Sequence, residues 1–184
     1  MGESMAAAAL LDKASGNLTP QAPVPSVAAF REAMRRFAGT VSVVTSGLGP
    51  ERTGFAATSV CSLAVEPPTL LVCLDRNASS WPVVRRHGAF CVNVLAEDQA
   101  AVAERFAGRS GLRGADRYRD AEWRTLETGA LALGGALLSI DCVLEEAIER
   151  HSHAILIGHV VAVTGVSEAR PLLYQHQAFR RLAP

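Results

Sequence analysis

Lysine and aromatic residues are scarce in this sequence, and charge of neither sign is in excess. Lys13 is the only lysine, aromatic residues make up 5% of the chain, and 18 basic residues balance 18 acidic ones. A net charge of zero argues against binding of nucleic acid through a broad basic surface. Because 49% of the residues are apolar and so few are aromatic, the core must consist mostly of Leu, Val and Ala.

Long apolar runs are missing as well. The N-terminal sequence MGESMAAAALL is apolar over a short stretch only, and Lys13 follows this stretch instead of preceding it. This order argues against a signal peptide, and no other stretch is long enough to span a bilayer. We therefore expect a soluble, cytoplasmic protein without a membrane partner.

The four cysteines form no CxxC pair. Cys61, Cys73, Cys91 and Cys142 all lie in apolar stretches that are typical of strands. This placement predicts reduced, buried thiols, as in proteins of a reducing compartment.

Three motifs of known enzyme sites are absent. No GxGxxG follows an apolar strand and no GxxxxGK[ST] occurs, which excludes the Rossmann and P-loop ways of holding a phosphate. The GxSxG motif is missing too, and no Ser or Cys has a base at a recognisable spacing. A nucleotide, if one binds, is therefore held by another arrangement.

The chain divides into a tail and one domain. Residues 1–25 are rich in Pro and turn formers and are expected to be a disordered tail, which leaves a domain over 26–184. Ser26 is a good N-cap for a helix that would run to Gly39. Apolar residues recur in it at helical spacing, at Val27, Phe30, Met34 and Phe37.

Strand-forming segments alternate with turn signals over the rest of the domain. Strands are predicted for 40–46, 54–65, 69–75, 89–96, 136–150 and 153–166. Helices are expected at the end of 76–88 and over 97–108, and 109–128 is expected to be a long polar loop. Because consecutive strands are joined as hairpins and not through βαβ units, the predicted fold is mainly β, a small antiparallel barrel with peripheral helices.

Residues 54–65, GFAATSVCSLAV, have side chains that are too small for a strand that only fills a core. A flat ring could lie against Ala56 and Ala57, and nearby hydroxyls could hold a phosphate or a ribityl chain. The candidates are Thr58, Ser59 and Ser62 in this segment and Asn77, Ser79 and Ser80 after the next strand. The alternative interpretation is that these are ordinary strand and cap residues.

Three histidines, His151, His153 and His159, lie near the last predicted hairpin. Residues two apart on a strand share a face, so a two-histidine site for zinc or iron is one interpretation. No carboxylate or cysteine stands at a supporting spacing, which favours a single histidine at the mouth of a pocket. The residues by themselves thus indicate a small β-barrel protein with a pocket near 54–81.

Several motifs occur in the order found in a known family. They are FREAMRRFAGTVSVVT, GFAATSVCSLAVEPPTLLVCL, NASSW, FCVNVL and HAILIGHV. Over about residues 30–181 the chain resembles the flavin reductase-like family, the short-chain reductases of two-component flavin monooxygenases. The resemblance implies an FMN-binding split β-barrel that forms a homodimer. It also implies NADH or NADPH as reductant, FAD or FMN as acceptor, and a separate monooxygenase that receives the reduced flavin.

The resemblance further implies roles for individual residues. Flavin contacts are expected at Gly54, Phe55, Ala56, Ala57, Thr58 and Ser59 for the ring, at Cys61 and Ser62 for the ribityl chain and phosphate, and at Asn77, Ser79, Ser80 and Trp81 for the phosphate end. His153 would be the catalytic residue beside the nicotinamide, and Phe179 would lie near the same site. No metal ligand is implied.

The chain departs from the family pattern at two points. Thr58 stands where the family often has Asn, which changes one contact to the ring. His151 and Ser152 stand where the family often has Gly-Asp, so that Ser152 replaces a carboxylate among the expected cofactor contacts. We expect these changes to affect nicotinamide affinity or the choice between NADH and NADPH, with NADH as the preferred reductant.

In such a protein, hydride would pass from C4 of the nicotinamide to N5 of the flavin. The two rings must approach to roughly 3–3.5 Å, and no strong base is required. One alternative is a flavin carrier or sensor on the same barrel that catalyses nothing. Others are a metal-dependent enzyme that uses His151 and His153, and an oxidoreductase that keeps its flavin and reduces another acceptor.

Overall fold

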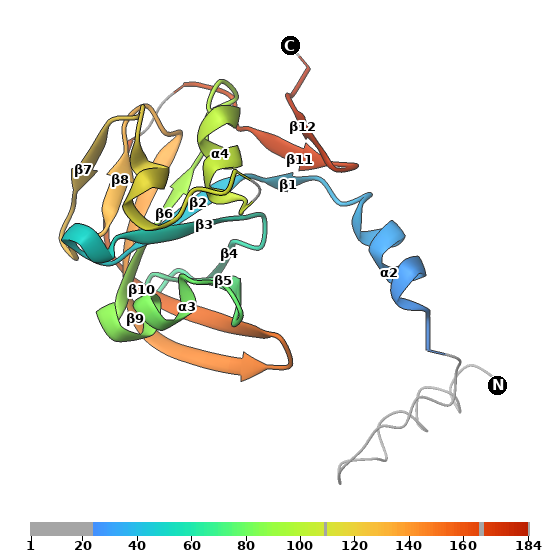
Figure 1. Cartoon of the computed structure of the whole chain (residues 1–184), viewed down its shortest axis with the longest axis horizontal. Helices are drawn as coiled ribbons and strands as arrows, with labels where there is room; N and C mark the ends of the chain where they lie inside the picture. The colour runs from blue at the N-terminus through green and yellow to red at the C-terminus, as the bar shows by residue number, and fades with distance from the viewer. Residues whose placement is uncertain (1–23, 109, 166–167, 184) are drawn as a thin grey trace, which may run out of the picture. The chain divides into compact units, whose positions relative to one another are not determined.

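The computed structural model describes residues 24–108, 110–165 and 168–183, which divide into two compact units at Met34 (Figure 1). The first unit contains α2 (Val27–Met34). The Ser26 hydroxyl accepts a hydrogen bond from the Ala29 N–H at 3.1 Å, which confirms the predicted N-cap. The predicted tail, residues 1–25, lies almost wholly outside the described residues.

The second unit begins at Arg35, before the point where the helix was expected to end. The Arg35 carbonyl accepts a hydrogen bond from the His176 N–H at 2.8 Å. The Arg36 carbonyl accepts one from Gln175 Nε2, also at 2.8 Å. These bonds occupy carbonyls that would otherwise have continued the helix, so the predicted extension to Gly39 is wrong.

A seven-stranded antiparallel sheet forms most of the second unit (Figure 1). Its order is β3 (Thr53–Ala57), β2 (Ser42–Ser46), β6 (Ala89–Val94), β9 (Leu138–Arg150), β10 (His153–Thr164), β5 (Thr69–Asp75) and β4 (Cys61–Ala64). The β2–β3 and β9–β10 pairs confirm the predicted hairpins. Within the described residues the sheet has two ends, β3 and β4, and is not closed into a barrel by strand pairing. The fold is therefore mainly β, as predicted.

The segment 54–65 was expected to be one strand, and this prediction is wrong. It forms β3 and β4, which pair with β2 and β5 at opposite ends of the sheet. The chain crosses between them over residues 58–60. Ser59 makes this crossing possible, because its hydroxyl accepts a hydrogen bond from the backbone of β5 and donates one to it.

Smaller elements surround this sheet. β1 (Gly39–Thr40), β11 (Leu173–Gln175) and β12 (Ala178–Arg180) form a three-stranded sheet, and β7 (Trp123–Thr125) pairs with β8 (Leu131–Leu133). The helices are α3 (Trp81–His87), α4 (Ala100–Phe106) and the short 3₁₀ turns η1 (Gly49–Glu51) and η2 (Gly114–Tyr118). In Figure 1, α4 lies above the ribbon of β3 and α3 lies below it.

In the predicted polar loop, residues 110–128 form more regular structure than expected. This segment contains η2 and β7, whose residues Tyr118 and Trp123 pack on Phe106 of α4. The ring centroids of Tyr118 and Trp123 lie 5.2 Å and 5.8 Å from that of Phe106. This aromatic cluster fastens the segment to α4.

Two large apolar clusters form most of the core of the described residues, and a small third one contains Cys91, Ala130 and Ala132. One large cluster contains Val44, Phe90 and Leu156 of the main sheet, and the other contains Phe106 of α4 and Leu172. The described part of the chain has no helix with the length and apolar character needed to cross a membrane.

The cysteines are all free, but they are not all buried. Cys91 and Cys142 are buried, Cys73 is half-buried and Cys61 is exposed. Cys61 departs from the prediction because β4 is the end strand of the sheet. Burial, with a smaller contribution from Asp141, raises the pKa of the Cys142 thiol to about 12, so this thiol remains protonated.

Candidate active site

A cavity of about 430 Å³ lies between β3, the β5–α3 connection and the end of α4, and we call it the β3–β5 pocket. Its wall includes Gly54–Ser59, Ala78–Ser80, Phe106–Gly108, Arg117 and His153. The volume lies in the range of small-molecule sites. The β3–β5 pocket thus includes residues of the predicted region, 54–81, together with residues from α4, η2 and β10 that lie outside it.

A second cavity of about 720 Å³ lies beside the β11–β12 hairpin, and we call it the hairpin pocket. Tyr174 and Phe179 line it as an edge-to-face pair whose ring centroids are 5.7 Å apart. Ala56, Ala57, Thr58 and Ala107 line both pockets. The two cavities therefore share one wall of small side chains.

Ten of the predicted site residues line at least one of the two pockets. Gly54, Phe55, Ala56, Ala57, Thr58, Ser59, Ser79, Ser80 and His153 line the β3–β5 pocket, and Phe179 lines the hairpin pocket. The other five, Cys61, Ser62, Asn77, Trp81 and Ser152, lie outside both. His153 and Phe179 were expected near one site, and the structure places them on two adjoining cavities.

Small side chains leave room for the β3–β5 pocket. Gly54, however, is needed for close packing and does not create this room. A Cβ on Gly54 would lie 2.6 Å from the Val44 carbonyl oxygen and 2.8 Å from Cε1 of Phe106. Gly54 thus lets α4 pack against β3. The open space comes instead from Ala56, Ala57 and their neighbours.

The hydroxyls of the β3–β5 pocket are not equivalent. The Ser59 hydroxyl is bonded to both backbone groups of Cys73, so it fixes the wall. Ser80 is buried at the N-cap position of α3, where its side chain makes no capping hydrogen bond. The Ser80 hydroxyl is therefore suited to bind a ligand.

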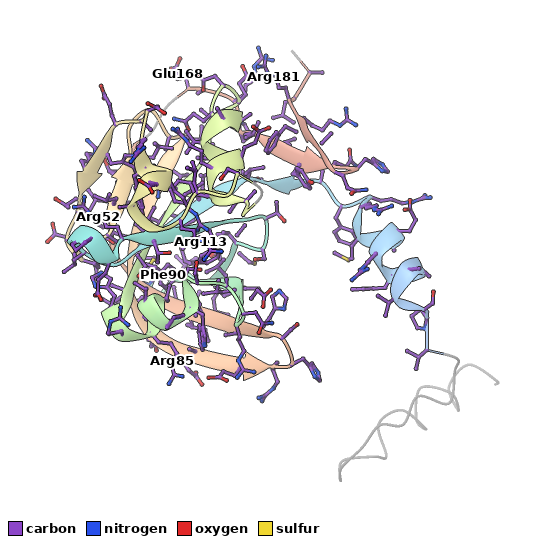
Figure 2. The ribbon with its side chains drawn as sticks, viewed as in Figure 1. Arg52, Arg85, Phe90, Arg113, Glu168 and Arg181 are labelled. Carbon is purple, nitrogen blue, oxygen red and sulfur yellow. The ribbon has the colours of Figure 1, made fainter. Side chains whose placement is uncertain are left out.

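Two predicted phosphate contacts have structural roles. The Asn77 N–H donates to Oδ1 of Asp75 at 2.9 Å and closes the turn after β5. Trp81 is 8% exposed, and its ring packs in the core and lies 5.4 Å from the Arg85 guanidinium. Arg85 extends from α3 beside the β9–β10 hairpin (Figure 2) and forms an ion pair with Glu149 at 3.6 Å.

His153 is the first residue of β10 and lies opposite Asp75 of β5. Its Nδ1 is 2.9 Å from the Ser152 hydroxyl, and the Ser152 carbonyl accepts a hydrogen bond from the Arg76 N–H. Ser152 therefore orients the His153 ring at the edge of the pocket. His151 adopts a φ of 50° in the turn before β10. His151 and His153 therefore do not alternate along one strand, as a two-histidine metal site would require.

The described residues contain no group of three or more His, Cys, Asp or Glu side chains placed to hold a metal ion. Sequence reasoning missed several residues that line the cavities, among them Glu104, Arg117 and Tyr174. Glu104 and Arg117 lie in stretches dense with charged residues, and no local signal separates them from their solvated neighbours.

Residues 34–183 match the family model of the flavin reductase like domain. The chain belongs to the flavin reductase-like family. It is 40% identical over 155 residues to a Klebsiella pneumoniae protein named FMN reductase (NADH) RutF, and the match covers 84% of this chain and 93% of the relative. The order of motifs noted in the sequence is thereby explained.

Two solved structures of flavin reductase-like proteins resemble this fold. One is the NADH:FAD oxidoreductase SgcE6 of Streptomyces globisporus, with a TM-score of 0.80, 29% identity and coverage of 90% of this chain and all of that one. The other is BorF, the flavin reductase component of a bacterial two-component tryptophan halogenase. It has a TM-score of 0.79 and 31% identity, and the match covers 86% of this chain and 99% of that one.

The residues of the β3–β5 pocket fit a flavin. Ala56 and Ala57 of β3 give an apolar surface for a flat ring, and Ala78, Ser79 and Ser80 of the β5–α3 connection supply a methyl group and two hydroxyls on the other wall. Most ligand sites combine an apolar surface with a few placed polar groups in this way.

Proposed function

We propose that this protein is a flavin reductase that uses NADH to reduce FMN or FAD and supplies the reduced flavin to a separate monooxygenase. One observation carries the proposal: two ligand-sized cavities meet at a wall of small residues, Ala56, Ala57, Thr58 and Ala107. Two aromatic cofactors that exchange a hydride must lie in contact, and two adjoining cavities leave room for both. The names of the relatives support NADH as reductant and a flavin as acceptor.

The flavin ring would lie in the β3–β5 pocket against Ala56 and Ala57, with its phosphate toward Ser79 and Ser80. The nicotinamide would enter from the hairpin pocket, past Phe179. When bound, the two cofactors supply the redox chemistry, which is the transfer of a hydride from nicotinamide C4 to flavin N5. The chain brings the rings together and excludes water from between them.

His153 lines the β3–β5 pocket and not the hairpin pocket, so it would orient the nicotinamide only where that ring has passed Phe179 and reached the flavin. The His153 ring is held by the Ser152 hydroxyl, in the place where the family often has a carboxylate. A histidine that hydrogen-bonds the carboxamide suits a reaction that needs no general base.

We also propose that the chain forms a split β-barrel and a homodimer. The Ser59–Cys73 hydrogen bonds connect the end of β3 to β5 and bring the two ends of the sheet together. On β10, the residues Ile155 and Ile157 are only half-buried, whereas Ala154 and Leu156 on the other face are fully buried. A second copy would cover this half-exposed apolar face.

A separate monooxygenase as acceptor is proposed by analogy with BorF, which is named as one component of a two-component halogenase. The free cysteines fit a reducing compartment such as the cytoplasm. NADH is also available there.

The proposal is tested by following NADH absorbance with the purified protein, with FMN, with FAD and without flavin. Flavin-dependent loss of NADH supports it, and the two rates give the preferred flavin. Flavin binding without NADH oxidation would instead indicate a carrier. A flavin that stays bound through gel filtration would indicate an oxidoreductase with another acceptor.

A further inference from the structure

Arg117 is a buried cation on the wall of the β3–β5 pocket. Arg117 is a residue of η2, and it is 8% exposed. Nη1 donates to the Gly54 carbonyl at 2.6 Å, and Nε donates to the Leu112 carbonyl at 3.0 Å. These two bonds fix the plane of the guanidinium against the first residue of the segment assigned to the flavin ring.

The acidic residues near Arg117 in the sequence bind other arginines. Asp116 pairs with Arg119 at 2.6 Å, and Asp120 lies 3.4 Å from Arg105. Among the described residues, no carboxylate forms an ion pair with Arg117. Burial lowers the pKa of Arg117, Tyr118 opposes this effect, and Arg113 adds to it.

A buried charge without a counter-charge is costly, and such a charge in a cavity is a candidate for ligand binding. The transfer of a hydride moves two electrons and one proton to the flavin. NADH leaves as NAD⁺, and the flavin keeps one added negative charge until it takes a proton from water. A cation beside the ring therefore stabilises the reduced flavin more than the oxidised flavin.

We propose that the Arg117 guanidinium lies at the edge of the flavin ring and stabilises the negative charge that the ring gains on reduction. This inference rests on the proposed function. The position of Arg117 supports the ring over the phosphate as its partner, because Arg117 is anchored to Gly54 and the phosphate is assigned to Ser79 and Ser80. Reduced flavin should depend on Arg117 more strongly than oxidised flavin does.

The test compares dissociation constants of oxidised FMN and of chemically reduced FMN under anaerobic conditions, without NADH. In Arg117→Gln, which keeps N–H donors but loses the charge, the ratio Kd(oxidised)/Kd(reduced) should fall on the order of tenfold. That change corresponds to about 30 mV in the two-electron potential of the bound flavin. Arg117→Lys should keep most of the wild-type ratio.

The control is Arg119→Gln, since Arg119 is exposed and already paired with Asp116. An unchanged ratio in Arg117→Gln would overturn the proposal. So would a loss of FMN affinity that is equal in both redox states and absent with riboflavin, because that pattern places the phosphate at Arg117. The measurement uses no NADH, so it is independent of whether the protein oxidises NADH.

If Arg117→Gln does not fold, a pH titration of reduced flavin bound to the wild-type protein tests the proposal. Reduced flavin bound to the protein should remain anionic at lower pH than free reduced flavin does. The absorbance of the anion reports this difference. The charged and titratable groups that face this site are Cys73, Asp75 and His153 on the pocket wall and Arg113 and Tyr118 beside Arg117. Identical titration of bound and free reduced flavin would contradict the proposal.

Discussion

The hydroxyl oxygen of Ser59 lies 3.1 Å from the backbone nitrogen of Cys73 and 3.3 Å from its carbonyl oxygen. Ser59 belongs to the crossing between β3 and β4, and Cys73 belongs to β5, so these two bonds join separate parts of the main sheet. Both residues line the β3–β5 pocket. Ser59 therefore fixes one wall of the proposed flavin site.

Replacement of Ser59 by Ala should weaken both the fold and the flavin site. Two backbone groups of Cys73 lose their partner, so the free energy of unfolding should fall by about 1–2 kcal/mol. Flavin affinity should fall roughly threefold to tenfold, because the wall is no longer fixed. Urea denaturation and flavin fluorescence titration measure the two effects. Unchanged affinity would show that the Ser59–Cys73 bonds do not shape the site.

His153→Ala should impair the use of NADH without loss of flavin binding. Because His153 is assigned to the nicotinamide, kcat/KM for NADH should fall roughly tenfold or more, with flavin affinity nearly unchanged. His159→Ala is the matched control, since His159 lies on the same strand at a position opposite Thr69. Steady-state kinetics equal to wild type would remove His153 from the reaction.

Thr128→Val should destabilise the fold through Asp141. Asp141 is fully buried, and it accepts hydrogen bonds from the Thr128 hydroxyl at 2.6 Å and from the Thr128 N–H at 2.8 Å. Loss of a hydrogen bond to a buried carboxylate costs about 1.5–3 kcal/mol. Thr125→Val, at an exposed position, should change the unfolding free energy by less than about 0.5 kcal/mol. Equal effects of the two variants in urea denaturation would refute the account of Asp141.

The stability of the protein should decrease at acidic pH because of His87. Burial lowers the pKa of His87, although Asp141 opposes the shift, and its Nε2 is buried without a hydrogen-bond partner. The unfolded chain takes up a proton near the ordinary value of roughly 6.5, whereas the folded chain resists it. Stability from this group is therefore full above that pH and is lost as the pH falls toward the folded value.

Urea midpoints measured from neutral to mildly acidic pH test this dependence on His87. The His87→Gln variant should show a flatter profile than the wild type over this interval. Parallel profiles for the two proteins would assign the acid sensitivity to other groups.

Gly158→Ala should strain the core beneath β10. The added Cβ would lie 2.5 Å from Cζ of Phe90 and 2.9 Å from Cβ of Cys142, both in buried residues. Overpacking of this kind costs about 1–3 kcal/mol. The double variant with Phe90→Leu should recover part of the loss, because the ring then no longer meets the new methyl group. Additive losses in thermal unfolding would place the strain elsewhere.

Much of the main sheet follows from local sequence. The strand predicted for Thr69–Asp75 has these bounds in the structure, because β-branched and apolar residues fill it and prolines precede it. The β9–β10 hairpin was also predictable from two long apolar segments around a polar turn. Local sequence patterns are sufficient to predict strands that pair with the next strand along the chain.

The break at residues 58–60 could not be predicted, since it depends on Ser59 meeting a strand 14 residues further along the chain. The same holds for 110–128, where Tyr118 and Trp123 pack on Phe106 from a segment with a polar sequence. Arg117 was missed for a related reason, because only the fold places its guanidinium against Gly54. Long-range contacts of single side chains leave no periodic pattern in the sequence.

An anaerobic reaction of this protein with NADH and FMN tests the central proposal most directly. The absorbance of reduced nicotinamide and that of oxidised flavin are followed together, with and without the protein. We expect both bands to decay at the same protein-dependent rate, with one flavin reduced for each NADH consumed. Flavin that stays oxidised while NADH persists, at protein concentrations that bind both, would contradict the assignment of a flavin reductase.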